Sequence, residues 1–165
     1  MQYFISRIPI ILNLALMAYI LGCLLGAEHA KADNRAELVQ IAHKSHLYVS
    51  RRALDAFIEA SRVFDIPAKE LFSISVIESN LNPNAFRVNN NGSYDIGLMQ
   101  VNSINKNKCT EYDINTILGN VMCGAKILNQ LKQKHSDYLG RYHSATPKYK
   151  NKYIAKVSKI LYTLD

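Results

Sequence analysis

The sequence predicts one mainly α-helical domain that follows an apolar N-terminal segment. After residue 33, apolar residues recur mostly at the three- and four-residue spacing of an α-helix, and the two-residue alternation of a β-strand is nearly absent. With 48% hydrophobic and 20% charged residues, the composition is that of a globular protein. About 130 residues follow the apolar segment, which is enough for one domain with its own core.

Residues 1–32 have the three parts of a secretory signal peptide. Arg7 precedes an uncharged apolar run from Ile8 to Ala27, and Ala30-Lys31-Ala32 forms the small-residue pattern of a cleavage site. We therefore expect a mature chain that begins at Asp33. The run is also long enough to remain as a membrane anchor, and the residues around Cys23 loosely resemble a lipoprotein box, although the apolar run continues beyond them. Each alternative sends the domain across the inner membrane, so we expect a periplasmic protein.

The expected export affects the interpretation of the two cysteines in the domain. Cys109 and Cys123 form an even pair in an oxidising compartment, which favours a disulfide. A metal site is the weaker alternative because no histidine or cysteine cluster accompanies them, so we expect no metal.

The charge balance favours an anionic partner. The chain carries a net charge of +7, and the loss of residues 1–32 would leave +6, since they contain Arg7, Lys31 and Glu28. An anionic wall polymer or membrane surface suits an exported domain better than nucleic acid, for which no motif is recognisable. The alternative is that the lysines only solvate the surface.

The predicted helices begin at residue 51. Helical spacing covers residues 51–64, and a second helix starts at Pro67, ends near Ser79 and cannot pass Asn82-Pro83. Residues 80–95 are rich in asparagine and predict a polar loop. Three further helices are expected, over residues 96–104, 115–134 and 147–162. In the last of these, the apolar residues expected to face the core are Tyr149, Tyr153, Val157 and Ile160. Residues 33–50 are expected as an extension, which could bind a partner, before a domain of residues 51–165.

Glu78 is the candidate acid. It follows a run of six uncharged residues, Phe72 to Ile77, at the end of a predicted helix. Partial desolvation raises the pKa of a carboxyl group and allows it to act as a general acid near neutral pH. The alternative for Glu78 alone is a solvent-facing residue in a last helical turn.

Two further segments accompany Glu78. Residues 94–102 mix a glycine turn with apolar side chains and amides, and residues 140–144 offer the ring and hydroxyl of Tyr142. Together, Glu78-Ser79-x-Leu-Asn82-Pro83, Gly97-Leu98-Met99-Gln100-Val101-Asn102 and Tyr142-His143-Ser144 resemble the three motifs of the soluble lytic transglycosylase (SLT) catalytic domain, whose fold is related to goose-type lysozyme. The resemblance covers about residues 54–160 and is greatest to small members associated with secretion, pili or conjugation.

The resemblance implies a site and a reaction. Glu78 would be the catalytic acid and base, with substrate contacts from Ser79, Gly97, Leu98, Met99, Gln100, Asn102, Tyr142 and His143. His143 stands where the family usually has an asparagine. The expected substrate is a peptidoglycan glycan strand, cleaved without a cofactor to leave a 1,6-anhydro end, by a monomer that opens the wall for a secretion, pilus or conjugation machine.

Alternatives concern Asp95 and catalysis itself. As a second carboxylate, Asp95 could hold a water and make the protein a lysozyme-type hydrolase, or it could merely cap a helix that starts near Ile96. An inactive wall-binding factor of a secretion machine is a third interpretation, which the intact Glu78 disfavours.

Overall fold

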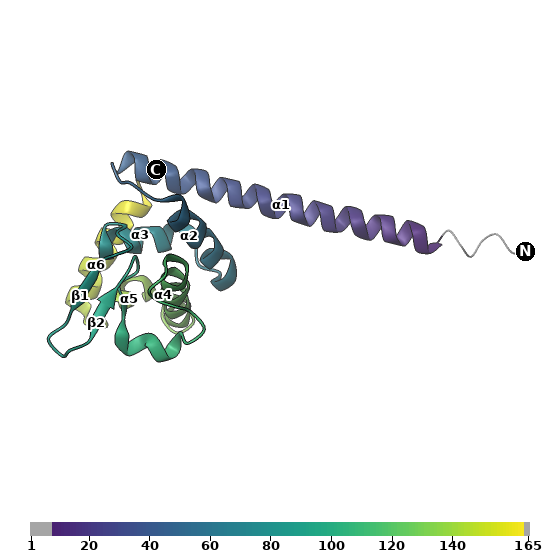
Figure 1. Ribbon diagram of the computed structural model, residues 1–165. Coiled ribbons are helices and arrows are strands. Elements are labelled where there is room, and N and C mark those ends of the chain that lie inside the picture. The colour runs from purple at the N-terminus through teal and green to yellow at the C-terminus, as the bar shows by residue number, and fades with distance from the viewer. Residues whose placement is uncertain (1–7, 164–165) are drawn as a thin grey trace, which may run out of the picture. The chain divides into compact units, whose positions relative to one another are not determined.

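The computed structural model describes residues 8–163, in two compact units with the boundary at Asp33 and Asn34 (Figure 1). Helix α1 (Ile8–Lys44) begins in the first unit and ends in the second. Among the described residues, no helix has both the length and the hydropathy needed to cross a bilayer. Arg7 lies outside the described residues, and the signal peptide stays a prediction.

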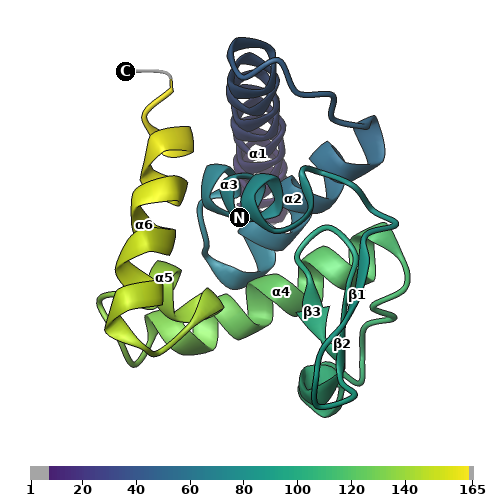
Figure 2. The same cartoon turned by 90° about the vertical axis from the view of Figure 1, so that its left-hand side faces the viewer.

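Helices form most of the second unit, as predicted. Besides the end of α1, they are α2 (Arg51–Phe64), α3 (Ala68–Ser79), α4 (Ile117–Lys132), α5 (Tyr138–His143) and α6 (Pro147–Leu161), of which α5 was not predicted. The start of α2 at residue 51 follows from Ser50, whose hydroxyl accepts a hydrogen bond from the Ala53 N–H. Figure 2 shows α6 and a small β-sheet on opposite sides of α3 and α4.

The sheet was not predicted, and it replaces both the loop expected at 80–95 and the helix expected at 96–104. Its strands are β1 (Phe86–Val88), β2 (Tyr94–Ile96) and β3 (Val101–Asn102), all antiparallel, followed by the 3-10 helix η1 (Ser103–Lys108). Strands of two or three residues are too short for alternation to appear in the sequence. Gly97 ends β2 with a φ of 76°, a conformation that interrupts a helix.

The core lies between the helices. Phe57 of α2 and Phe72 of α3 are fully buried and meet edge to face, with ring centroids 5.9 Å apart. Leu38 and Ile41 are also fully buried, so the segment expected as an extension contributes to this core. On α6, Tyr153 and Val157 are buried as predicted, whereas the prediction of an inward Tyr149 is wrong, since 56% of it is exposed.

The predicted disulfide joins Cys109 and Cys123. It ties the end of η1 to α4 and closes a short loop, which stabilises the fold by about 3 kcal/mol through the lost entropy of the unfolded chain.

Candidate functional site

A polar cleft of about 400 Å³ lies among α3, the sheet and α5. Its lining is made mainly of carboxylates, amides and cations, with few apolar side chains. The residues are Glu78, Arg87, Asn89, Asp95, Gln100, Val101, Asn102, Asn105, Ile127, Tyr142 and His143.

Glu78 occupies the last turn of α3, at the edge of the core. Its side chain is only 17% exposed. The next residue, Ser79, donates a hydrogen bond from its hydroxyl to the Leu98 carbonyl at 2.8 Å, which fixes the end of α3 against the segment that follows β2. Asn80 then ends the helix in the left-handed conformation, with a φ of 53°. These contacts hold the Glu78 carboxyl group in the cleft.

Burial is the main influence on the Glu78 carboxyl group and raises its pKa. The Tyr153 hydroxyl, His143 and Arg87 act in the opposite direction, while the negative charge of Asp95 adds to the increase. A carboxyl group with a raised pKa keeps its proton at higher pH than an exposed glutamate does. It can therefore donate a proton to a bound group and take one back.

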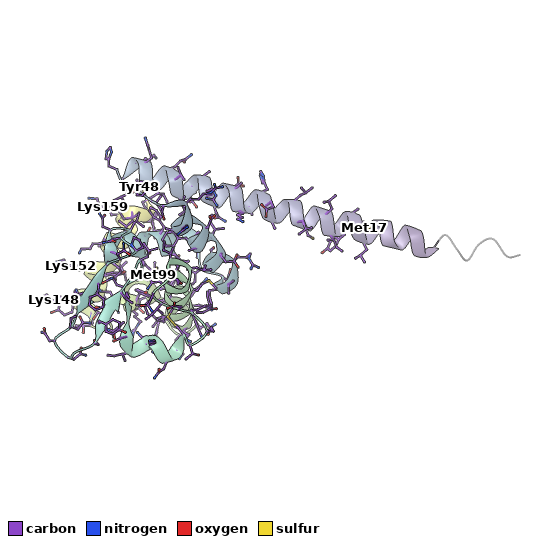
Figure 3. All side chains as sticks on the ribbon, viewed as in Figure 1. Met17, Tyr48, Met99, Lys148, Lys152 and Lys159 are labelled. Atoms are coloured by element: carbon purple, nitrogen blue, oxygen red, sulfur yellow. A yellow bond between two sulfur atoms is a disulfide. The ribbon has the colours of Figure 1, made fainter. Side chains whose placement is uncertain are left out.

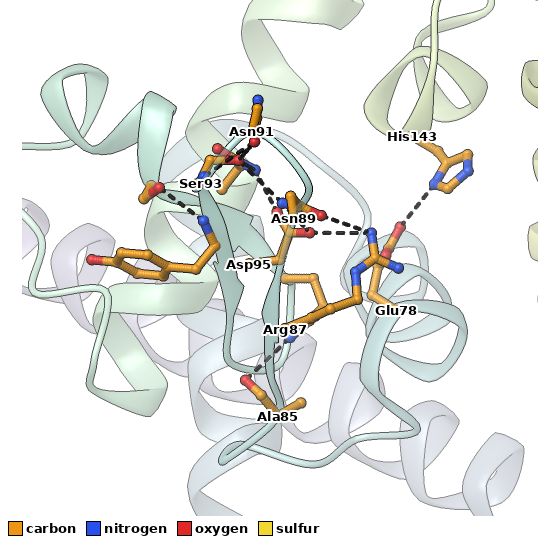
Figure 4. A network of polar contacts seen from close by, with 12 residues as sticks. Glu78, Ala85, Arg87, Asn89, Asn91, Ser93, Asp95 and His143 are labelled. Carbon is orange, nitrogen blue, oxygen red and sulfur yellow. Dashed lines mark hydrogen bonds and ion pairs between the residues drawn. The ribbon is translucent and has the colours of Figure 1, made fainter.

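His143 and Tyr153 enclose this carboxyl group from α5 and α6. The His143 Nδ1 lies 3.8 Å from Glu78 Oε1 (Figure 4). The imidazole stacks on the Tyr153 ring, with centroids 4.8 Å apart and planes 3° from parallel. Within residues 8–163, the buried Tyr153 hydroxyl makes no hydrogen bond of regular geometry, yet it lies close enough to Glu78 to lower the pKa of that carboxyl group. The sequence predicted Tyr153 as a core or groove-wall residue and did not select it as a site residue.

Asp95 lies on β2 and does not cap a helix, so that interpretation is wrong. The sheet register places it between Arg87 of β1 and Asn102 of β3. Asp95 Oδ1 accepts a hydrogen bond from the Asn102 amide at 2.6 Å. Its Oδ2 accepts from Asn89 at 3.1 Å and from Arg87 at 3.3 Å (Figure 4). The carboxylate is thus held by three donors at the wall of the cleft.

Three of the residues expected to contact substrate, Gly97, Leu98 and Met99, are buried. The Leu98 and Met99 side chains are 0% exposed and belong to the core, because the turn after β2 points them inward. The Met99 backbone still serves the site, since its carbonyl accepts a 2.9 Å hydrogen bond from the Tyr142 hydroxyl. Burial raises the pKa of Tyr142 well above its usual value, and the charges of Glu78 and Asp95 add to this.

Gln100 lines the cleft but has a structural function too. Its φ of 46° is unusual for a residue with a side chain. Its amide Nε2 donates to the carbonyls of Gly97 at 3.0 Å and Ala85 at 3.2 Å, which holds the turn closed. The amide oxygen has no hydrogen-bond donor among the described residues, so it remains available to a ligand.

Asn120 of α4 makes hydrogen bonds to this turn, a contact that the sequence did not indicate. It is 2% exposed, and its Oδ1 accepts from the Met99 N–H at 2.9 Å. Its Nδ2 donates to the carbonyls of Ile96 at 2.8 Å and Ile114 at 3.1 Å. A Cβ on Gly97 would lie 2.4 Å from this nitrogen, so glycine is required there for close approach as well as for its positive φ.

Comparison with known proteins matches residues 55–152 to the model of the transglycosylase SLT domain. The chain belongs to the SLT domain family. It is 30% identical to the protein IpgF of Shigella flexneri over 117 residues, which cover 66% of this chain and 77% of IpgF. It is also 30% identical to the invasion protein IagB of Salmonella typhimurium over 101 residues, which cover 56% of this chain and 63% of IagB.

The residues of the SLT motifs thus form two groups, one that lines the cleft and one that holds the lining in place. Six of the residues selected from the sequence line the cleft, namely Glu78, Asp95, Gln100, Asn102, Tyr142 and His143. Ser79, Gly97, Leu98 and Met99 lie behind this surface and hold it in place. Arg87, Asn89 and Asn105 line the cleft but precede or follow the motifs, so the SLT pattern did not indicate them.

Proposed function

We propose that this SLT-domain protein is a peptidoglycan lytic transglycosylase in which Glu78 is the single catalytic acid and base. The substrate is the β-1,4 bond between N-acetylmuramic acid and N-acetylglucosamine, and the product carries a 1,6-anhydromuramic end. The observation that carries the proposal is the Glu78 carboxyl group, which has a pKa raised by burial and lines a cleft rich in amides. Amides suit the hydroxyl and acetamido groups of a sugar chain.

The proposed reaction needs one proton at Glu78. The protonated carboxyl group donates it to the bridging oxygen as the bond to C1 of the muramic acid breaks, and the substrate's own acetamido group stabilises the developing cation. The Glu78 carboxylate then takes the proton of the C6 hydroxyl, whose oxygen bonds to C1. The carboxyl group is thereby restored. His143 and the Tyr153 hydroxyl, which contact this group, would stabilise its charged form between the two steps.

A lysozyme-type hydrolase is the second candidate, because Asp95 lines the same cleft and could hold a water. Its two oxygens already accept hydrogen bonds from Asn102, Asn89 and Arg87. A carboxylate engaged in this way favours a fixed wall of the cleft over a base that activates water.

Product analysis separates these two reactions. We expect mass spectrometry of sacculi digested by the protein to give muropeptides that are lighter by one water than those released by a hydrolase. A digest of the same sacculi with a lysozyme provides the reducing-end reference. If all products carry a reducing end, the lyase proposal is wrong and the protein is a hydrolase.

The pH profile of kcat/KM should respond in opposite directions to two neighbours of Glu78. Arg87 lowers the pKa of Glu78 and Asp95 raises it, and the acid must be protonated to act. Arg87→Gln should therefore move the alkaline limb of the profile to higher pH, and Asp95→Asn should move it to lower pH. Rates on soluble glycan fragments, measured where each variant remains folded, test this. Shifts in the same direction, or none, would contradict Glu78 as the titrating acid.

We further propose a periplasmic function in which the protein opens the wall locally for a secretion, pilus or conjugation machine. The predicted signal peptide in residues 1–32 and the similarity to an invasion protein support this proposal. Deletion of the gene should then impair assembly of that machine. Assembly should be restored only by a reintroduced gene that encodes Glu78.

A further inference from the structure

The outer side of α6 carries an unpaired row of positive charges. This helix contains five lysines and no acidic residue. Lys150 is paired with Asp137, but Lys148, Lys152, Lys156 and Lys159 are exposed, and we call these four the lysine face. Figure 3 labels three of them, Lys148, Lys152 and Lys159. Within residues 8–163, none of the four side chains makes an ion pair or a hydrogen bond.

The spacing of the lysine face aligns its charges. Its members are four, four and three residues apart, so they lie along one side of the helix over about 16 Å. Like charges at this spacing repel each other and destabilise a helix. Lys148 is also unfavourable in the first turn, at the positive end of the helix dipole, whereas Lys159 is favourable in the last turn.

Packing does not explain the lysine face. The buried residues of α6 are Tyr153 and Val157, on a different side of the helix. Some other cations of the domain have acidic partners, as Lys126 has Glu111. Others, such as Arg52 and Lys134, have none among the described residues but are single exposed charges and do not form a row along one side of a helix. A row of charges that opposes the folding of its own helix, and that has no partner within the described chain, is expected to have an anionic partner outside it.

We propose that the lysine face is a second binding surface for peptidoglycan, which takes the carboxylates of its peptide stems. The proposal rests on the proposed function, because it assigns the partner from the polymer that the cleft would cut. Peptide stems place separate carboxylates at intervals along a glycan strand, and separate lysine ammonium groups along a helix match such a row as point charges. The same helix contributes Tyr153, which lies beside Glu78 and stacks on His143 of the cleft lining, so α6 packs behind this wall of the cleft.

Binding to intact sacculi tests the proposal. All forms of the full chain carry Glu78→Gln, so that lysis does not change the amount of polymer. One variant changes the four lysines of the lysine face to glutamine. A matched control changes Arg51, Arg52, Lys106 and Lys134, which are also exposed, to glutamine. The parent carries Glu78→Gln alone. At low salt, we expect the lysine-face variant to bind sacculi at least about tenfold more weakly than the parent, and the control to bind nearly as well as the parent.

Three comparisons decide the outcome. On sacculi whose carboxylates have been converted to amides with a carbodiimide and ammonia, parent and lysine-face variant should bind alike. Equal binding of the two variants to intact sacculi, or a difference that persists on the amidated sacculi, would overturn the proposal. A difference seen only on phosphatidylglycerol vesicles would assign the surface to a membrane instead.

The proposed function can fail separately. With Glu78 intact, the lysine-face variant should cleave short peptide-free glycans at the parent rate. If no form cleaves glycan but the lysines still govern binding to intact sacculi, the surface stands and the catalytic assignment falls.

Discussion

Replacement of Glu78 by glutamine is expected to remove lytic activity while the domain remains folded. Glutamine keeps the size of the side chain and its place in the last turn of α3, but it can neither donate nor accept the proton that the reaction requires. General acid–base catalysis contributes about 10²- to 10⁴-fold, so the rate of release from sacculi should fall at least about 100-fold.

Glu70 provides a matched control on the same helix. It is also a carboxyl group whose pKa is raised by burial, and both of its oxygens lie 2.9 Å from the Tyr138 hydroxyl. It does not line the cleft. Glu70→Gln keeps an acceptor for Tyr138 and should retain nearly full activity. Lysis by Glu78→Gln at the parent rate would refute the assignment, and equal losses in both variants would point to damage of α3.

Helices α2, α3, α4 and α6 could be predicted because each has a signal in its local sequence, whereas the short α5 was not predicted. The apolar spacing in 51–64 and the serine at residue 50 specify α2 with little tertiary help. The uncharged run before Glu78 suggested desolvation but did not by itself exclude a solvent-facing side chain, and the family resemblance selected Glu78 as the acid. The burial of its side chain accords with desolvation. The motif residues Gln100, Asn102, Tyr142 and His143 could be placed together only through the family resemblance, since α4 separates the last two from the first two along the chain.

The sheet and its consequences could not be predicted in this way. Strands β1 to β3 are held by pairing between short segments, and only their register brings Arg87 and Asp95 together with Asn102. The inward direction of Leu98 and Met99 depends on the turn at Gly97, not on their own spacing. Tyr153 looked like any inward aromatic residue of a helix, because its proximity to Glu78 arises from the packing of α6 against α3.

Asn120 is the strongest case of such a long-range requirement, and its replacement by leucine should destabilise the domain severely. Leucine has a similar size but would leave the Met99 N–H and the carbonyls of Ile96 and Ile114 without the partners they now have. A buried backbone group that loses its partner costs about 1–3 kcal/mol. The free energy of unfolding should therefore fall by on the order of 3 kcal/mol or more, and the melting temperature by roughly 10 °C.

The effect of Asn120→Leu should extend to the cleft, because the hydrogen bonds of Asn120 hold the turn that carries Gln100. We expect less activity even below the melting temperature, where most molecules are folded. Asn129→Leu on the same helix is the control, since that partly exposed side chain makes no hydrogen bond within the described residues. It should change stability by less than about 0.5 kcal/mol. If thermal unfolding shows the two leucine variants to be equally stable, then Asn120 is a replaceable core residue, and the turn of the second SLT motif must be held by its own hydrogen bonds alone.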